Sequence, residues 1–303
     1  MQNTDRRSFL TQFATYGAGL GLASSLASAA PDWKKQIGLE VYTVRDLAAK
    51  DLEGTLAKIA EIGYKEIEPA GAGYGGMQPK QFRAMLDRLG LSVPSTHEGA
   101  TAGPGLEKEL EGFQIMGIKY TEIRTPGPRA PQTSAEEGFK KEAARLNEYG
   151  KITAKFGMKM LFHNHSQEFQ PFAAGGKLRP YDILLSETDP KLVAMQLDIG
   201  WASVAGQNIL DMFKKNPGRF ELWHVKDVRG IKLLPADMEQ RARMRAITLV
   251  PVGQGEVDYK PLFAAAEMAG MKHFCIEQDN AADWGDSIAA ARVSFRNLNK
   301  ILG

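Results

Sequence analysis

A single (β/α)8 barrel preceded by a cleavable signal peptide is the architecture that this sequence of 303 residues predicts. Three observations predict it. Eight short apolar runs have the composition of buried strands, amphipathic helical stretches separate them, and several of these stretches end in a glycine that leads directly into the next run. An open doubly wound sheet usually has fewer strands and a glycine-rich phosphate loop, and no GxGxxG motif follows any of the runs.

The predicted strands alternate with predicted helices along the chain. The strands span 37–42, 64–69, 91–97, 118–124, 158–165, 192–200, 220–227 and 271–279. In the first helical stretch, Leu52 and Leu56 lie on one face, and Asp51 is placed as the N-cap. A last helix is expected near residues 286–302. Five junctions, such as EIGYKEIE and MAGMKHFCIE, place a glycine C-cap between a helix and the next strand.

Two connections are longer than the others, at about 170–190 and about 228–270. Insertions in barrels commonly shape the mouth of the active site. We therefore expect these two segments near the functional residues, as candidate lids.

The composition is that of a globular protein. The chain is 43% apolar and 24% charged, enough to bury the core of one large domain. Lysine and arginine number 38 against 36 acidic residues, and no basic stripe or basic helix is present, so nucleic acid is not an expected partner. The only cysteine, Cys275, lies in the apolar run HFCIE, so no intramolecular disulfide can form and a core position is expected.

The first thirty residues have the composition of a signal peptide. Arg6 and Arg7 in DRRSFL precede the uncharged run FATYGAGLGLASSLASAA, and this pattern resembles the twin-arginine export signal. General secretion is the alternative. We expect residues 1–30 to be cleaved after about Ala30, which leaves residues 36–303 as the barrel domain. The mature protein is then expected in the periplasm, without a membrane anchor.

Most ionisable residues of the eight runs lie at the C-terminal ends, where barrels of this kind have their functional sites. The residues at these ends are Glu40, Tyr42, Glu68, His97, Glu122, Arg124, His163, His165, Asp198, His224, Lys226 and Glu277. Residues two apart on a strand face the same side, so His163 and His165 both face the barrel interior, as do His224 and Lys226.

Imidazole and carboxylate groups that converge from adjacent strands predict a metal centre. The expected ligands are His163, Asp198, His224 and Glu277. Mixed nitrogen and oxygen ligands favour one Mn, Zn, Co or Fe ion over Mg or Ca, and manganese is our first expectation. Asp198 has a second interpretation, as the cap of the following helix. A histidine at a strand end is also often a hydrogen-bonded core residue.

The order of the motifs resembles the sugar phosphate isomerase/epimerase group with its xylose-isomerase-like TIM barrel, over residues 36–303. The motifs are IGLEVYTVRD, YKEIEPAG, FHNHSQEF, LDIGWA, HVKD, VPVGQGEVDY and CIEQD. The resemblance implies a single divalent metal, and Asp198, His224 and Glu277 match the family's aspartate, histidine and final glutamate. His163 stands where many members have a glutamate that binds metal and moves protons. The HNH arrangement instead resembles the branch with inosose dehydratase and enzymes that act on 3-keto-glycosides.

We therefore expect an exported enzyme that removes a proton next to the carbonyl of a non-phosphorylated keto-sugar or 3-keto-glycoside, with metal assistance. His165 and Glu68 are the first candidates for the base, followed by His97. Lys226 is expected to bind the developing negative oxygen or to protonate a leaving group, and a salt bridge with Asp227 or another acid is its alternative. A sugar epimerase and a catalytically inactive carbohydrate-binding protein stay open, as does assembly into a homo-oligomer.

Five further residues are candidates for contact with the carbohydrate substrate. They are Glu40, Tyr42, Arg124, Glu168 and Trp201. Glu168 is expected to orient His165 from outside the ligand set. Trp201 and Trp223 offer apolar platforms to a sugar ring, with core packing as the alternative.

The two glutamates of the first strands also have a structural interpretation. Glu40 and Glu68 are then inner acids paired with Arg45 or Arg124. Both interpretations stay open from the sequence.

Overall fold

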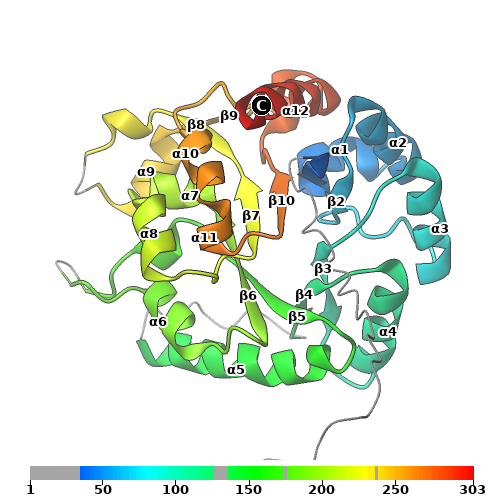
Figure 1. The fold of residues 1–303 in the computed structure, drawn as a ribbon, viewed down its shortest axis with the longest axis horizontal. Helices are drawn as coiled ribbons and strands as arrows, with labels where there is room; N and C mark the ends of the chain where they lie inside the picture. Colours follow the sequence, from blue (N-terminus) through cyan, green and yellow to red (C-terminus); the bar gives the residue numbers. More distant parts are fainter. Residues whose placement is uncertain (1–34, 126–135, 174–175, 236–237) are drawn as a thin grey trace, which may run out of the picture. The chain divides into compact units, whose positions relative to one another are not determined.

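The computed structural model describes residues 35–125, 136–173, 176–235 and 238–303. The predicted signal peptide at 1–30 lies outside the described residues. Within them, eight parallel strands are hydrogen-bonded in the order β2-β1-β10-β7-β6-β5-β4-β3, and the helices surround these strands (Figure 1). The predicted (β/α)8 barrel is confirmed.

Each predicted run contains or overlaps one strand of the barrel. The strands are β1 (Gly38–Glu40), β2 (Glu66–Glu68), β3 (Ser95–Thr101), β4 (Tyr120–Arg124), β5 (Lys159–His163), β6 (Val193–Asp198), β7 (Leu222–Val225) and β10 (His273–Ile276). β3 begins later than predicted because Pro94 has no N–H to donate to a neighbouring strand. β1 ends earlier because Val41–Val44 forms the 3-10 helix η2.

The sheet closes between its two outer strands, β2 and β3. Ser92, just before β3, accepts a hydrogen bond from Ile67 N (2.9 Å) and donates one to the Lys65 carbonyl (2.9 Å). Glu66 and Ser92 form a parallel bridge. These contacts link the eight strands into a nearly closed ring.

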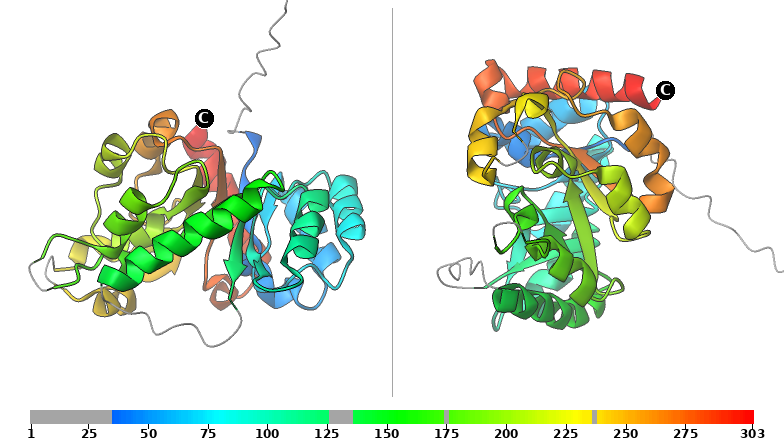
Figure 2. Two further views of the ribbon diagram at one scale, coloured as in Figure 1. Left: turned by 90° about the horizontal axis from the view of Figure 1, so that it is seen from below. Right: turned by 90° about the vertical axis from the view of Figure 1, so that its left-hand side faces the viewer.

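The helices form the outer layer, and α2 and α12 begin where the sequence predicts. They are α1 (Arg45–Ala48), α2 (Leu52–Ile62), α3 (Pro79–Leu89), α4 (Leu106–Met116), α5 (Glu136–Ala154), α6 (Pro180–Glu187), α7 (Ile199–Val204), α8 (Ile209–Lys215), α9 (Gln240–Ala246), α10 (Tyr259–Ala264), α11 (Ala266–Ala269) and α12 (Ser287–Leu302). The Asp51 side chain caps α2 by accepting a hydrogen bond from Gly54 N (2.9 Å). α5, the long green helix in Figure 2, packs against β5 and α6.

The glycines at the five predicted junctions end their helices with positive φ angles. They are Gly63, Gly90, Gly117, Gly157 and Gly270. Only glycine adopts this conformation without a steric cost, which explains its repeated use there. In the described ranges, no helix is both long enough and apolar enough to span a bilayer.

The long connection before β10 is packed onto the barrel. It contains an antiparallel hairpin of β8 (Asp227–Arg229) and β9 (Thr248–Val250). Val228 and Leu249 of the hairpin form an apolar cluster with Trp201 of α7. This part of the predicted lid therefore belongs to the packed structure around the mouth.

At the N-terminal end of the strands, buried charges are paired with one another. The Glu221 carboxylate is 5% exposed and accepts hydrogen bonds from Lys272 Nζ (2.7 Å) and from Lys159 Nζ. His273 Nδ1 lies 3.0 Å from the Glu66 carboxylate. Burial alone would raise the pKa of Glu221. The hydrogen bonds and positive charges of Lys159 and Lys272 lower it by a larger amount, so the net pKa is below its ordinary value.

We expect Glu221→Gln to lower the free energy of unfolding at pH 7 by about 1–2 kcal/mol, because both lysines remain partly exposed. The folded-state pKa of Glu221 is lowered, so its stabilisation is present above the ordinary glutamate pKa of about 4.3 and is lost as pH falls. Urea unfolding at several pH values measures this difference. Glu53→Gln, which breaks an exposed pair with Arg88, is the matched control. An equal effect of both substitutions would contradict the prediction.

Candidate metal centre

The four predicted metal ligands meet at the C-terminal mouth of the barrel. His163 ends β5, Asp198 ends β6, His224 lies in β7 and Glu277 directly follows β10. These strands are neighbours in the sheet, and Asp198 pairs directly with His224 in the strand register. One ligand atom from each of the four residues lies within 4.8 Å of the others.

The converging atoms lack the hydrogen bonds that buried polar atoms normally make. All four atoms are buried, and within the described part of the chain His163 Nε2, Asp198 Oδ2, His224 Nδ1 and Glu277 Oε2 make no hydrogen bond of ordinary geometry. They are in charge contact, because Glu277 Oε2 lies 2.7 Å from His224 Nδ1 and both carboxylate oxygens lie within 3.0 Å of Lys226 Nζ. A buried polar atom without a partner is costly. Two imidazole nitrogens and two carboxylate oxygens around one point are a suitable ligand set for Mn, Fe, Co or Zn. The residues present therefore fit a divalent metal.

The helix-cap interpretation of Asp198 is confirmed, and it leaves the second carboxylate oxygen available for a metal. Its Oδ1 accepts a hydrogen bond from Trp201 N (2.8 Å) and caps α7, while Oδ2 faces the other ligands. His163 Nε2 lies 3.5 Å from this Oδ2. The helix cap thus fixes the carboxylate in the orientation that a metal requires.

Asn164, the middle residue of the HNH motif, holds the end of β6 against β5. Its Oδ1 accepts a hydrogen bond from Asp198 N (3.1 Å), and its Nδ2 donates to the Asp198 carbonyl (3.4 Å) and the His165 carbonyl (3.2 Å). The side chain is fully buried. Sequence reasoning missed this role, and the available signal was a polar residue at the buried end of a strand.

Lys226 lies directly beside the ligand carboxylates. Its Nζ is 3.0 Å from Asp198 Oδ2, 2.8 Å from Glu277 Oε2 and 2.8 Å from Asp279 Oδ2. Burial lowers the pKa of Lys226, but the three carboxylates raise it more, so the net pKa is well above its ordinary value. The side chain is therefore a fixed positive charge at the mouth. Asp279 was not among the predicted site residues.

The alternative salt bridge of Lys226 forms with other acids, Asp198, Glu277 and Asp279, and not with Asp227. The Asp227 carboxylate instead accepts hydrogen bonds from the backbone N–H groups of Gly253 (2.9 Å) and Gly255 (2.9 Å), in the VPVGQGEVDY motif. A Cβ at Gly255 would lie 2.0 Å from Asp227 Oδ1. The glycine is therefore required for this loop to wrap around the carboxylate.

Gly200 in the LDIGWA motif permits the close approach of Lys226. A Cβ at position 200 would lie 2.6 Å from the Lys226 carbonyl oxygen and 2.8 Å from Lys226 Cβ. Any larger residue would displace the lysine from the ligand carboxylates.

Glu68 lies at the base of the site and is fully hydrogen-bonded. It accepts hydrogen bonds from Gln196 Nε2 (2.7 Å), from His224 Nε2 (2.7 Å) and from the Ser95 hydroxyl. Burial raises the pKa of Glu68, but His97 and His224 lower it more, to about 2. A carboxylate with this pKa is a weak base, so the contacts favour a positioning role for Glu68 over that of the base.

His165 lies at the mouth, and its ring is exposed. Its ring centroid is 4.9 Å from that of His163 and 6.3 Å from that of Trp201. Desolvation by the surrounding side chains and the positive charge of Lys226 lower the pKa of His165, so the imidazole is neutral at pH 7. A neutral, accessible imidazole beside the ligand set is suited to accept a proton.

The predicted role of Glu168 differs in detail. Its carboxylate accepts a hydrogen bond from the backbone N–H of His165 (2.8 Å) and not from the ring. Glu168 therefore fixes the main chain at His165 at the start of the loop after β5.

Neither inner glutamate pairs with an arginine, so that interpretation is wrong. Glu40 Oε1 lies 3.4 Å from His97 Nδ1, and burial, followed by the charge of Glu277, raises the pKa of Glu40 well above its ordinary value. The guanidinium of Arg45 lies 3.8 Å above the Tyr42 ring. Tyr42 lies on η2 and is outside the ligand set.

Arg124 is exposed at the end of β4, where its Nη1 is 3.6 Å from Glu98 Oε2. This position is on the rim, and Arg124 is not one of the residues that surround the ligand atoms. The rim position is compatible with substrate contact.

The two predicted tryptophan platforms have different positions. The Trp201 ring lies 5.0 Å from Lys226 Nζ, at the site. Trp223 is fully buried and stacks on Phe213 with a centroid distance of 5.1 Å. It precedes His224 on the strand and so faces the outer helices. Core packing is the correct interpretation of Trp223.

A second group of potential ligands shares His224 with the first. It consists of Glu40, Glu68, His97 and His224, whose ligand atoms also lie within 4.8 Å of one another. Here Glu68 already accepts hydrogen bonds from Ser95, Gln196 and His224. Among the described residues, Glu40 Oε2 and His224 Nδ1 of this second group also make no hydrogen bond, but each of the four residues of the first group has such an atom, so the first group is the better candidate for a metal site.

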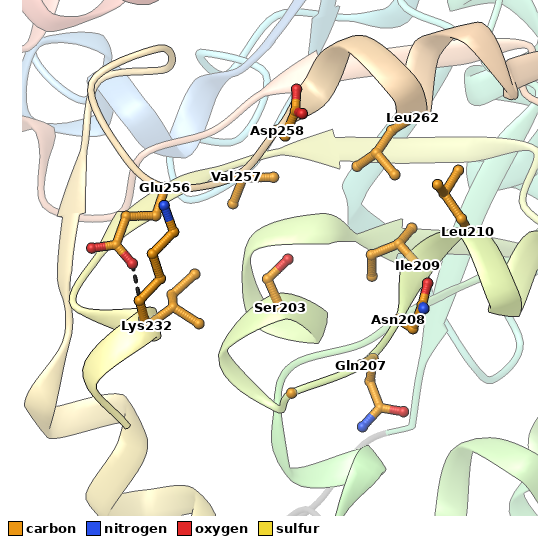
Figure 3. A pocket seen from close by; sticks show the side chains of 12 residues that line it. Ser203, Gln207, Asn208, Ile209, Leu210, Lys232, Glu256, Val257, Asp258 and Leu262 are labelled. Carbon is orange, nitrogen blue, oxygen red and sulfur yellow. Dashed lines mark hydrogen bonds between the residues drawn. The ribbon is translucent and has the colours of Figure 1, made fainter. Parts of the chain in front are cut away.

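A cleft of about 390 Å³ lies outside the barrel, between the α7–α8 turn, the segment from η4 (Ile231–Leu233) and the start of α10 (Figure 3). Ser203, Asn208 and Lys232 are among the residues that line it, and Lys232 N donates to Glu256 Oε2 (2.9 Å) at its edge. The cleft shares no residue with the metal ligands.

Comparison with known proteins gives consistent relatives. The family model described as "Xylose isomerase-like TIM barrel" matches residues 56–298. An inosose dehydratase of Geobacillus thermodenitrificans (strain NG80-2) is 31% identical over 76% of this chain and 83% of its own length. An inosose dehydratase of Geobacillus kaustophilus (strain HTA426) is 27% identical over 69% of this chain and 73% of its own.

Solved structures share the fold. A sugar phosphate isomerase/epimerase from Parabacteroides distasonis ATCC 8503 superposes with a TM-score of 0.67 at 22% identity, over 91% of this chain and 96% of that one. The IOLI protein, whose structure contains a bound zinc atom, has a TM-score of 0.64 at 15% identity, over 88% of this chain and 98% of that one. At these identities the likeness establishes the barrel.

We expect Mn²⁺ to raise the thermal unfolding midpoint, because an ion at 100 times its Kd stabilises the folded state by about 2.7 kcal/mol. Glu277→Gln removes one ligand charge. Loss of a group that only orients a ligand weakens metal binding by at least about tenfold, so loss of a ligand itself is expected to weaken Mn²⁺ binding by more than that. Calorimetric titration of metal-free protein measures the affinity.

His273→Asn is the matched control for this prediction, because His273 lies at the N-terminal end of β10, opposite the mouth. It is expected to bind Mn²⁺ as the unchanged protein does. Equal affinity of the Glu277→Gln variant and the unchanged protein would contradict the assignment.

Proposed function

The chain belongs to the xylose isomerase-like TIM barrel family and is an enzyme of the isomerase, epimerase or lyase type, and on this premise we propose its reaction. It removes the proton next to the carbonyl of a non-phosphorylated keto-sugar or 3-keto-glycoside and eliminates a group from the adjacent carbon, with a divalent metal bound. The relatives named inosose dehydratases support elimination.

One observation supports this proposal most directly. One end of the barrel holds three features together. They are four ligand atoms that make no hydrogen bond, the neutral imidazole of His165 and the buried ammonium group of Lys226. His163, Asp198, His224 and Glu277 would hold the metal, and manganese remains our first expectation. A bound divalent ion supplies Lewis-acid stabilisation of negative charge on the carbonyl oxygen.

The chain's own residues provide the two proton transfers. His165 takes the proton from the carbon next to the carbonyl, which breaks the C–H bond. The C–O bond at the neighbouring carbon then breaks, and Lys226 protonates the departing oxygen. One proton is taken and one is given, so the products are an enone and water or an alcohol.

The charge around the site favours a substrate without phosphate. Among the described residues that contact the ligand carboxylates, Lys226 is the only lysine, and no arginine contacts them. Phosphate groups are usually bound by clustered arginines and lysines. Export to the periplasm is part of the same proposal and rests on the DRRSFL motif and the apolar run after it.

The reaction is tested with purified, Mn²⁺-loaded protein and two substrates, a 3-keto-glycoside and an inosose. In D2O we expect deuterium at the carbon next to the carbonyl, followed by enone absorbance. Absence of exchange with both substrates would overturn the proposal. An epimerised product without an enone would replace elimination by epimerisation.

Lys226→Met separates turnover from metal binding in the same assay. We expect kcat to fall by about 100-fold or more, the usual range for loss of an acid or base. Metal content is expected to fall far less, because Lys226 is not a ligand. An equal loss of kcat and metal would contradict the role of Lys226 in the reaction.

A further inference from the structure

Gln196 is a buried polar residue at the site that is neither a ligand nor a candidate base. It lies on β6, two residues before Asp198, so both side chains face the barrel interior. Its side chain is 1% exposed. The Gln196 amide contacts Glu68 on one side and His97 on the other.

The amide has only one orientation that fits its neighbours. Gln196 Nε2 lies 3.0 Å and 2.7 Å from the two oxygens of Glu68. Glu68 also accepts a hydrogen bond from the Ser95 hydroxyl, so it acts as an acceptor here, and the NH2 group and not the carbonyl must face it. The carbonyl oxygen of Gln196 then faces His97 Nε2 at 2.6 Å.

That carbonyl determines which nitrogen of His97 bears a proton. A carbonyl oxygen is an acceptor only, so His97 Nε2 must donate, and the lone pair of the neutral ring is at Nδ1. His224 follows the same pattern at Nε2, which donates to Glu68 at 2.7 Å, while its Nδ1, the predicted ligand atom, lies 2.7 Å from Glu277 Oε2.

We propose that Glu68 and Gln196 act as one positioning pair that fixes both His224 and His97 as the Nε2–H tautomer. Glu68 acts directly on His224, and Gln196 extends its effect to His97. The Nδ1 of His224 is thereby kept for the metal, and the Nδ1 of His97 is kept as a proton acceptor. The second role rests on the proposed function, whereas the tautomers themselves do not.

The location of His97 gives this control a chemical use. Its ring centroid lies 5.0 Å from that of His163, and His165 lies 4.9 Å from His163. The imidazoles of His97 and His165 therefore both lie next to the ligand His163. His97 Nδ1 lies 3.4 Å from Glu40 Oε1, so under the proposed function His97 exchanges a proton with the substrate through the Glu40 carboxyl group, as a partner to His165.

The experiment uses Gln196→Met, which keeps the volume but removes the amide, in protein loaded with diamagnetic Zn²⁺. Nitrogen-15 NMR of the five histidines reports each tautomer, and His97→Gln assigns the His97 signals. In unchanged protein we expect a protonated Nε2 and a bare Nδ1 at His97. In Gln196→Met we expect averaged His97 signals and unchanged His224 signals.

Activity provides an independent readout. We expect Gln196→Met to lower kcat by about 10- to 100-fold, with unchanged metal content and little change in KM, as for loss of a positioning partner. Gln207→Met, a substitution of the same type on the loop before α8, is the matched control and should leave both readouts unchanged. Urea unfolding establishes that each variant is folded.

The outcomes separate the two proposals. A proton on Nδ1 of His97 in unchanged protein, or unaltered His97 signals in Gln196→Met, would overturn the positioning pair. Failure of the unchanged protein to act on any keto-sugar would overturn the proposed function, yet the NMR result would still decide the tautomers.

Discussion

The structure depends on the burial of several carboxylates at one end of a closed barrel. Glu40, Glu68, Asp198 and Glu277 are at most 5% exposed, and isolated buried charges are strongly unfavourable. Positive charge must therefore be supplied nearby. Lys226 supplies part of it, and the group of His163, Asp198, His224 and Glu277 fits a divalent metal that would supply the rest.

Buried charged side chains are hydrogen-bonded at one end of the barrel, whereas several charged atoms of the described residues lack hydrogen bonds at the other, and this difference indicates where the functional site lies. At the N-terminal end, Glu221 is bonded to Lys159 and Lys272, and His273 is paired with Glu66. These contacts are complete and stabilise the fold. At the mouth, Lys226 Nζ lies within 3.0 Å of Asp198 Oδ2 and Glu277 Oε2, but these charged atoms make no hydrogen bond of ordinary geometry among the described residues. Incomplete pairing of this kind is the structural signature of a ligand site.

The sequence predicts the barrel and the ligands because both follow from local patterns. Each apolar run, helix cap and junction glycine is recognisable within a few consecutive residues. The predicted strands end at or near Asp198, His224 and Glu277. Gln196 had the same signal, since it shares a strand face with Asp198. The roles of Asn164 and Asp279 required tertiary contacts between strands, which no local pattern specifies. The same limit explains why the sequence left open an arginine partner for Glu40 and Glu68 and a platform role for Trp223, both of which the structure excludes.

The central claim is that His163, Asp198, His224 and Glu277 bind one divalent ion. A crystal of the Co²⁺-loaded protein, measured on both sides of the cobalt absorption edge, tests it most directly. The account predicts one anomalous peak within bonding distance of His163 Nε2, Asp198 Oδ2, His224 Nδ1 and Glu277 Oε2. A peak among Glu40, Glu68 and His97 instead, or no peak at the mouth of the barrel, would contradict it.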